Sequence, residues 1–279
     1  MLRWIALLAV CACAAKSAPC PVAPAVAPSG APLLWRVSKD GGATVWLYGT
    51  IHDAGLAAVQ PSVLVALATS KRFASELGDA EPDKDAMREL SRIERGPGID
   101  QQLSADDWWD LRNALRGKIR EDDLRRARPW YALILLNRTS APKTESMDVG
   151  LARTARQHRQ SISGLETAED QIRALDRVVT IADLTQAIRT RKTLSCAYTG
   201  LLTAYAEGDL AALEPMLVIP RTAESMLWAR NRRWLPAIES FAADGGGFIA
   251  VGLGHLIGDQ GLPALLAKAG YTVERAPVP

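Results

Sequence analysis

Two short apolar segments, about 200 residues apart, end in the same pattern of glycine, two further residues and histidine. The first runs from Thr44 to His52 and the second from Phe248 to His255. Each is rich in β-branched and aromatic residues and stops at glycine, which is typical of a buried strand. Because a glycine past a strand end lets the backbone turn sharply, each histidine is expected in the crevice at the edge of a sheet. If the strands are neighbours, His52 and His255 converge.

A single Gly-x-x-His pattern has little specificity, but the chain has only three histidines and two of them follow these strands. The alternative is that both are hydrogen-bonded histidines of the core. The third, His158, lies among charged and polar residues near the end of a predicted helix. We expect it on the surface.

Two glutamates are expected beside the histidine pair. Segments 72–76 and 161–166 are each predicted to form a short strand, and they end in Glu76 and Glu166. Histidine nitrogens with carboxylate oxygens suit a divalent ion such as zinc, manganese or cobalt, with open positions for water. Which of the two glutamates would bind such an ion stays open at this stage.

Several segments together resemble a known family. They are Leu34–Val37, Tyr48–His52, Ala74–Asp79, Gly164–Thr167 with Gln171, Arg230–Asn231, Val251–Leu256 and Gly270–Val273. Their combination resembles the TraB/GumN family, which includes the Tiki proteins, over most of the chain after its leader. Ser75 and Gly78 stand where the family pattern has larger aliphatic residues, which loosens the packing expected around Glu76.

The resemblance implies a metal-dependent peptidase, because Tiki members are proteases that depend on manganese or cobalt. It makes His52 and His255 the expected metal ligands and Glu76 a ligand or general base. In the mechanism that we expect, either Glu76 or Glu166 transfers the proton. Arg230 and Asn231 either lie on a solvated helix face or serve the site. There they would hold a substrate carboxylate or a developing oxyanion. The expected partner is a peptide or protein substrate.

Two other functions fit the same crevice. A non-catalytic protein could bind a peptide or glycan there, as an accessory to surface polysaccharide export or to signalling. The crevice could also hold iron or haem, as it does in related folds. The tryptophans Trp108, Trp109, Trp228 and Trp234 would line a cleft or belong to the core.

The N-terminus has the composition of an export signal. Residues 1–15 have one arginine, a short apolar run and small residues, and Cys13 lies in a sequence that resembles a lipoprotein box. A lipid on Cys13 would attach the protein to a membrane. Residues 16–32 form a spacer rich in proline and alanine, followed by one domain over 33–279. We expect a periplasmic or outer-membrane-attached protein, with secretion as the second choice. Cys20 and Cys196 are either a disulfide or two unrelated thiols.

The rest of the chain predicts an α/β (α+β) fold, a single domain with a central mixed sheet built from N- and C-terminal strands and a largely helical middle. A hairpin is expected over Leu33–Tyr48, and a strand over Tyr271–Glu274. Helices are expected at 61–70, 147–159, 183–205, 210–217 and 222–241, and a charged region with several helices is expected over 82–138. With 33 Lys and Arg against 31 Asp and Glu, nothing favours nucleic acid binding. No phosphate-binding glycine loop or Gly-x-Ser-x-Gly elbow is present. The sequence does not indicate an oligomeric state.

Overall fold

The structure is a computed structural model that describes residues 28–39, 42–79, 83–140 and 144–277. The predicted leader, most of the predicted spacer, the acylation site Cys13 and the cysteine Cys20 lie outside these residues. The signal peptide, the lipid anchor and the Cys20–Cys196 disulfide therefore stay predictions. In the described part of the chain, no helix combines the length and apolar character needed to cross a membrane.

A mixed six-stranded sheet forms the centre of the molecule, in the order β4-β3-β5-β2-β1-β6. Its strands are β1 (Leu34–Ser38), β2 (Val45–Thr50), β3 (Arg72–Ser75), β4 (Ser161–Gly164), β5 (Gly247–Gly252) and β6 (Thr272–Arg275). The pairs β2–β5, β5–β3 and β3–β4 are parallel, whereas β1 is antiparallel to both β2 and β6. The predicted α/β fold, with its sheet built from N- and C-terminal strands, is confirmed.

The two histidine-bearing strands are neighbours, as expected. In the β2–β5 ladder Thr50 pairs with Gly252, so both strands end at the same level. Their residues are almost all buried, which explains the continuous apolar pattern of both segments. The predicted strands at Glu76 and Glu166 are one and two residues shorter than expected, because β3 ends at Ser75 and β4 at Gly164.

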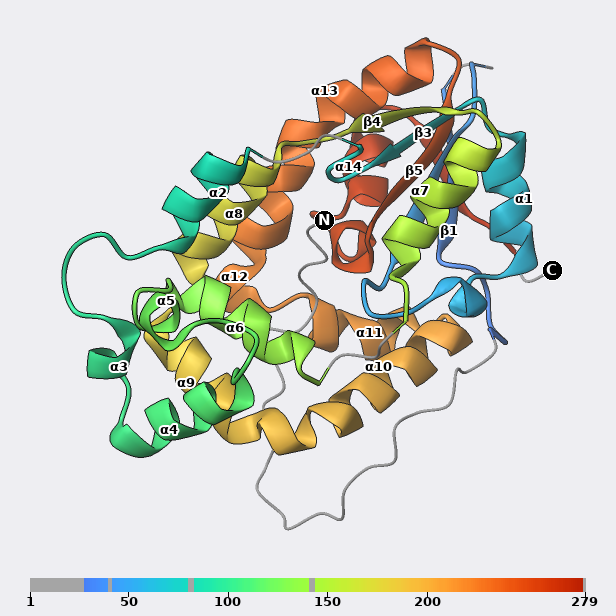
Figure 1. The fold of residues 1–279 in the computed structure, drawn as a ribbon. Coiled ribbons are helices and arrows are strands. Elements are labelled where there is room, and N and C mark those ends of the chain that lie inside the picture. Colours follow the sequence, from blue (N-terminus) through green and yellow to red (C-terminus); the bar gives the residue numbers. More distant parts are fainter. Residues whose placement is uncertain (1–27, 40–41, 80–82, 141–143, 278–279) are drawn as a thin grey trace.

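Helices cover both faces of the sheet (Figure 1). On one face α1 (Pro61–Thr69) packs beside α7 (Met147–Gln157), which contacts β3, β4 and β5. On the other face lie α13 (Ala229–Ala243) and α14 (Leu262–Lys268). Up to β4 the chain crosses the sheet toward the β4 edge, and after β4 it crosses back toward β6. Because crossovers between parallel strands are right-handed, the helices of these two halves lie on opposite faces. The 3-10 turns η1 (Leu56–Ala58) and η4 (Leu253–Leu256) follow β2 and β5.

The predicted helical middle has a hydrophobic cluster separate from the one under the sheet, and Trp130 and Leu111 are among its fully buried residues. Its helices are α2 (Lys84–Ser91), α3 (Ile99–Gln102), α4 (Ala105–Ala114), α5 (Glu121–Arg125), α6 (Pro129–Arg138), α8 (Ala168–Val178) and α9 (Ile181–Thr190). After these come η2 (Arg191–Thr193), α10 (Leu194–Glu207), α11 (Leu210–Leu217), α12 (Pro220–Ala223) and the π-helical turn η3 (Glu224–Trp228).

The single helix expected over 183–205 is wrong, because a 3-10 turn at Arg191–Thr193 separates α9 from α10. Thr190 donates its hydroxyl to Gln186 O, and Thr193 donates to Thr190 O, each over 2.8 Å. Threonine side chains that bond backbone carbonyls compete with regular helix geometry and favour a bend. The helix expected over 222–241 is likewise interrupted, by the π-helical turn.

Candidate active site

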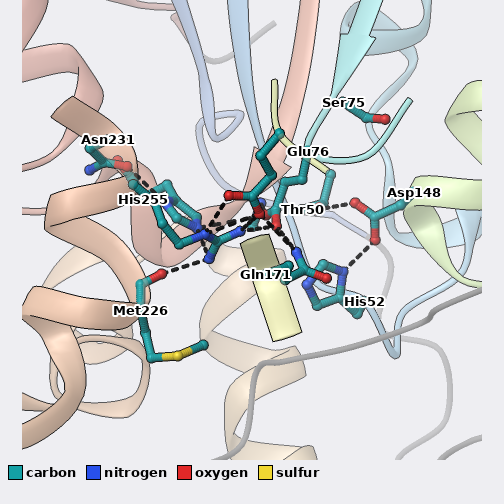
Figure 2. A network of polar contacts seen from close by, with 12 residues as sticks. Thr50, His52, Ser75, Glu76, Asp148, Gln171, Met226, Asn231 and His255 are labelled. Carbon is teal, nitrogen blue, oxygen red and sulfur yellow. Dashed lines mark hydrogen bonds and ion pairs between the residues drawn. The ribbon is translucent and has the colours of Figure 1, made fainter. Parts of the chain in front are cut away.

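The predicted site residues converge where β2, β3, β4 and β5 end (Figure 2). Glu76 directly follows β3 and His52 lies two residues past β2. Glu166 lies two residues past β4, and His255 is in η4 after β5. The parallel pairing of these strands brings their ends to one edge of the sheet, which is where open α/β sheets hold their sites.

Glu76 is at the centre of the polar network. Its Oε1 accepts the backbone N–H of Gly252 at 2.8 Å, and its Oε2 accepts from Gln171 Nε2 at 2.8 Å and from Arg230 at 2.7 Å. Burial alone would raise the pKa of Glu76, but the Arg230 cation and the two histidines outweigh it and lower the pKa to about 2. Glu76 is therefore ionised at neutral pH.

Arg230 links the two glutamates from the first turn of α13. Its Nε lies 3.1 Å from both carboxylate oxygens of Glu166, and its NH1 donates to Met226 O at 2.6 Å. With the bonds to Glu76 and His255, every N–H of the guanidinium has an acceptor. A π-helical turn, marked by the Ala229 N–H bond to Glu224 O, directly precedes Arg230. Such turns are frequent at functional sites.

The protonation of His255 is set by Asn231. Asn231 donates its amide nitrogen to His255 O at 3.1 Å and to Gln260 O at 2.8 Å, so its Oδ1 is an acceptor. This Oδ1 lies 2.6 Å from His255 Nδ1, which must therefore carry the proton. Burial, reinforced by Arg230, lowers the pKa of His255 to about 3, which keeps the ring neutral. Its Nε2 accepts from Arg230 at 3.0 Å and lies 3.7 Å from Glu76 Oε1.

His52 is oriented by a carboxylate that sequence reasoning missed. Asp148 Oδ2 lies 2.6 Å from His52 Nδ1, and its Oδ1 accepts the hydroxyl of Thr50, also at 2.6 Å (Figure 2). Burial opposes protonation of His52, but Asp148 outweighs burial and raises the pKa to about 9. The available signal was Ser146, the cap of α7, which places Asp148 in the first turn of that helix. Nothing in the sequence pairs this turn with His52.

Ser75 and Gly78, the two departures from the family pattern, close a turn after β3 that contains Glu76. The Ser75 hydroxyl accepts the backbone N–H of Gly78 at 3.0 Å. Gly78 has a φ of 60°, and a Cβ there would lie 2.5 Å from the backbone nitrogen of Gly164. The small residues thus let the loops after β3 and β4 approach closely. Glu76 itself is 8% exposed, and both of its carboxylate oxygens accept hydrogen bonds.

The other predicted residues are also located. His158 is exposed, as expected, and Arg230 and Asn231 are buried in the site rather than on a solvated helix face. Trp234 packs its ring 4.4 Å from that of His255, whereas Trp109 is 58% exposed on α4. Tyr198 of α10, which sequence reasoning missed, donates to Asp53 at 2.9 Å and so ties α10 to the loop after His52.

The donors suit a divalent ion, although they are not yet arranged around one. Each histidine has its Nδ1 fixed by an oxygen acceptor, the usual outer contact of a metal-binding imidazole. His52 Nε2 and Glu76 Oε1 lie 3.7 Å and 3.2 Å from the position that a Cβ on Gly252 would take. In the described residues, however, no three His, Cys, Asp or Glu side chains form a ready-made metal-binding group. The lone pair of His255 Nε2, which would bind a metal, accepts a hydrogen bond from Arg230 NH1 in this structure.

Comparison with known proteins decides the family. The model of the TraB/PrgY/gumN family matches residues 33–275, which include every residue of the network. The chain belongs to the TraB/PrgY/gumN family. The resemblance noted in the sequence is therefore confirmed. No curated protein and no solved structure matches the chain, so the roles of residues in this TraB/PrgY/gumN member must be argued from its own geometry.

Proposed function

We propose that this chain is a metal-dependent hydrolase of peptide bonds, in which His52, His255 and Glu76 bind a divalent ion such as manganese, cobalt or zinc. One observation carries the proposal. Both histidines have Nδ1 bound to an oxygen at 2.6 Å, and both turn their other ring edge toward Glu76. Packing in a core does not require that two histidines each bond an oxygen through Nδ1 and lie on either side of one ionised carboxylate.

The charge of the network supports a cation. Asp148, Glu76 and Glu166 contribute three carboxylates, against the one guanidinium of Arg230. Arg233 also approaches Glu166, at 3.8 Å, but it is half exposed and its charge is screened by water. When His52 is neutral, as a metal ligand must be, a negative charge remains on the network even if Glu166 holds a proton, because Asp148 and Glu76 then face the single cation Arg230. Burying such an excess is costly unless a cation is bound.

A divalent ion at this site would lower the pKa of a bound water and polarise a carbonyl group. Glu76, with its low pKa, stays ionised and is assigned as the ligand carboxylate. Burial raises the pKa of Glu166, even though Arg230 opposes the change, so Glu166 is the carboxyl assigned to hold a proton. The different environments of the two glutamates thus support different roles for them.

Arg230 has a second role in this mechanism. Its NH1 donates to His255 Nε2 at 3.0 Å, so binding of an ion by that nitrogen would release one N–H of the guanidinium. The released N–H would face the same space as Glu76 and His255. We assign it to the oxyanion that develops when a peptide carbonyl is attacked.

The test is metal content, measured by plasma mass spectrometry after reconstitution with manganese, cobalt or zinc. Wild type is compared with His52→Ala, His255→Ala and the control His158→Ala, which removes the exposed third histidine. We expect close to one metal per chain in wild type and control, and loss in both site variants with unchanged circular dichroism. Cleavage of a peptide library by each metal-loaded protein is then measured, and we expect it only in the wild type and the control. Absence of metal from the wild type under all conditions would refute the hydrolase and favour a ligand-binding accessory protein.

A further inference from the structure

A cleft opens directly onto the site and encloses about 620 Å³, including the solvent at its mouth. Glu76, Arg230 and His255 of the site are among its lining residues. One wall is apolar and consists of Met216, Leu217, Ile219, Met226, Leu227 and Leu253.

Most of the apolar wall comes from one stretch of chain. Residues 216–219 close α11 and lead into α12, and Met226 and Leu227 lie in the π-helical turn before Arg230. Met226 and Leu227 are thus held next to the Arg230 guanidinium by the same turn. Met216 is 37% exposed at the wall, and methionine side chains adapt readily to the shape of an apolar ligand.

The cleft has few ionisable lining residues. Its ionisable lining residues are Glu76, Arg230 and His255, and Thr222 and Thr50 are the other polar side chains. A charged side chain placed against Met216 and Leu227 would lose its water without gaining a partner, which is unfavourable. A leucine or phenylalanine side chain would instead bury apolar area there, at about 25 cal/mol for each Å².

We propose that this wall is the specificity pocket of the site and receives an apolar side chain of the peptide, adjacent to the bond that is cut. The position of the pocket next to the cleaved bond rests on the proposed hydrolase function, whereas binding of an apolar side chain does not. Its specificity-determining residues are Met216 and Leu227, neither of which takes part in the polar network of the site.

Two variants and one control test the pocket. Met216→Glu puts a charge on the wall at an exposed position, so the fold should tolerate it. Leu227→Ala removes part of the wall. Val65→Glu is the control, because Val65 is a 61% exposed apolar residue of α1 that does not line the cleft.

Binding is measured with the full-length, manganese-reconstituted protein and two probes, N-acetyl-leucinamide and N-acetyl-aspartic acid amide, by titration calorimetry. Cleavage is measured separately, with a peptide library read by mass spectrometry. We expect wild type and Val65→Glu to bind the leucine probe at least about tenfold more tightly, a discrimination usual for apolar pockets. Met216→Glu and Leu227→Ala should lose most of that preference, and cleavage sites should shift in parallel.

The outcomes separate the two proposals. Selective binding of the leucine probe without cleavage by any metal form would overturn the hydrolase and leave the pocket in place. Cleavage with no preference for apolar residues, or a preference unchanged in Met216→Glu, would overturn the pocket and leave the hydrolase. If the wild type shows no binding of the probes and no cleavage of the library, both proposals are overturned.

Discussion

Gly252 donates its backbone N–H to Glu76 Oε1 over 2.8 Å, and a Cβ on the same glycine would lie only 3.2 Å from that oxygen. The same Cβ would lie 3.7 Å from His52 Nε2 and 3.8 Å from His255 Cδ2. The missing side chain of Gly252 thus leaves open the space between the three proposed ligands. An added methyl group would occupy that space.

Gly252→Ala should abolish metal binding while the protein stays folded. The backbone of Gly252 has φ −52° and ψ 132°, which any L-residue can adopt. We expect the bound metal to fall to background and turnover to fall by about a hundredfold or more, because small displacements of reacting groups have large effects. Gly200→Ala is the control, since its Cβ would meet only Met216 Cε, at 3.9 Å. Full metal content in Gly252→Ala would place the ion elsewhere.

Asp148→Asn should lower the pKa of His52 from about 9, because burial then acts without the opposing carboxylate. Titration of the imidazole proton resonances in the metal-free protein measures this change. Metal affinity should fall by about 10–100-fold, as it does when the outer partner of a ligand histidine is lost. Glu145→Gln, which removes a surface carboxylate paired with Arg153, should leave both quantities unchanged. A His52 pKa still near 9 would contradict the assignment.

The stability of the metal-free protein should peak near neutral pH. The depressed pKa values of Glu76, about 2, and His255, about 3, mean that the unfolded chain binds more protons in acid. Stability from these groups is therefore lost as pH falls from about 6.5 toward 2. The raised pKa of His52, about 9, has the opposite sign, and its contribution is lost as pH rises from about 6.5 to 9. Urea unfolding at a series of pH values measures the profile. Stability that keeps rising up to pH 9 would contradict it.

Arg230→Met should destabilise the metal-free protein by about 3–5 kcal/mol, because it leaves Glu76 and Glu166 buried without their cation. Added manganese should restore part of that loss, since the ion supplies positive charge at the same place. Arg232→Met, on the same helix, removes a half-exposed arginine and should cost less than about 1 kcal/mol. Urea unfolding with and without manganese compares the two. Equal losses of stability in the two variants would contradict a special contribution of Arg230 and its two buried glutamates, Glu76 and Glu166.

Local patterns predicted the strands, because strand composition depends on nearby residues, and the repeated Gly-x-x-His pattern predicted that the two histidines converge if their strands are neighbours. They did not predict the residues that orient the two histidines through hydrogen bonds. Asp148 reaches His52 across 96 residues of sequence, and neither residue carries a signal for the other. The π-helical turn before Arg230 was equally hidden, because its residues favour an ordinary helix and tertiary packing decides otherwise.

The order of the sheet also determines when the site can exist during synthesis. The strand β5 lies between β2 and β3, although it is made after both of them. Until residue 252 has left the ribosome, β2 and β3 have no strand to join them, and the loop to be closed spans most of the chain. A chain released early by the ribosome would carry His52 and Glu76 but neither Gly252 nor His255. Truncated translation products are therefore unable to assemble the site, and any activity it confers belongs to chains completed at least through η4.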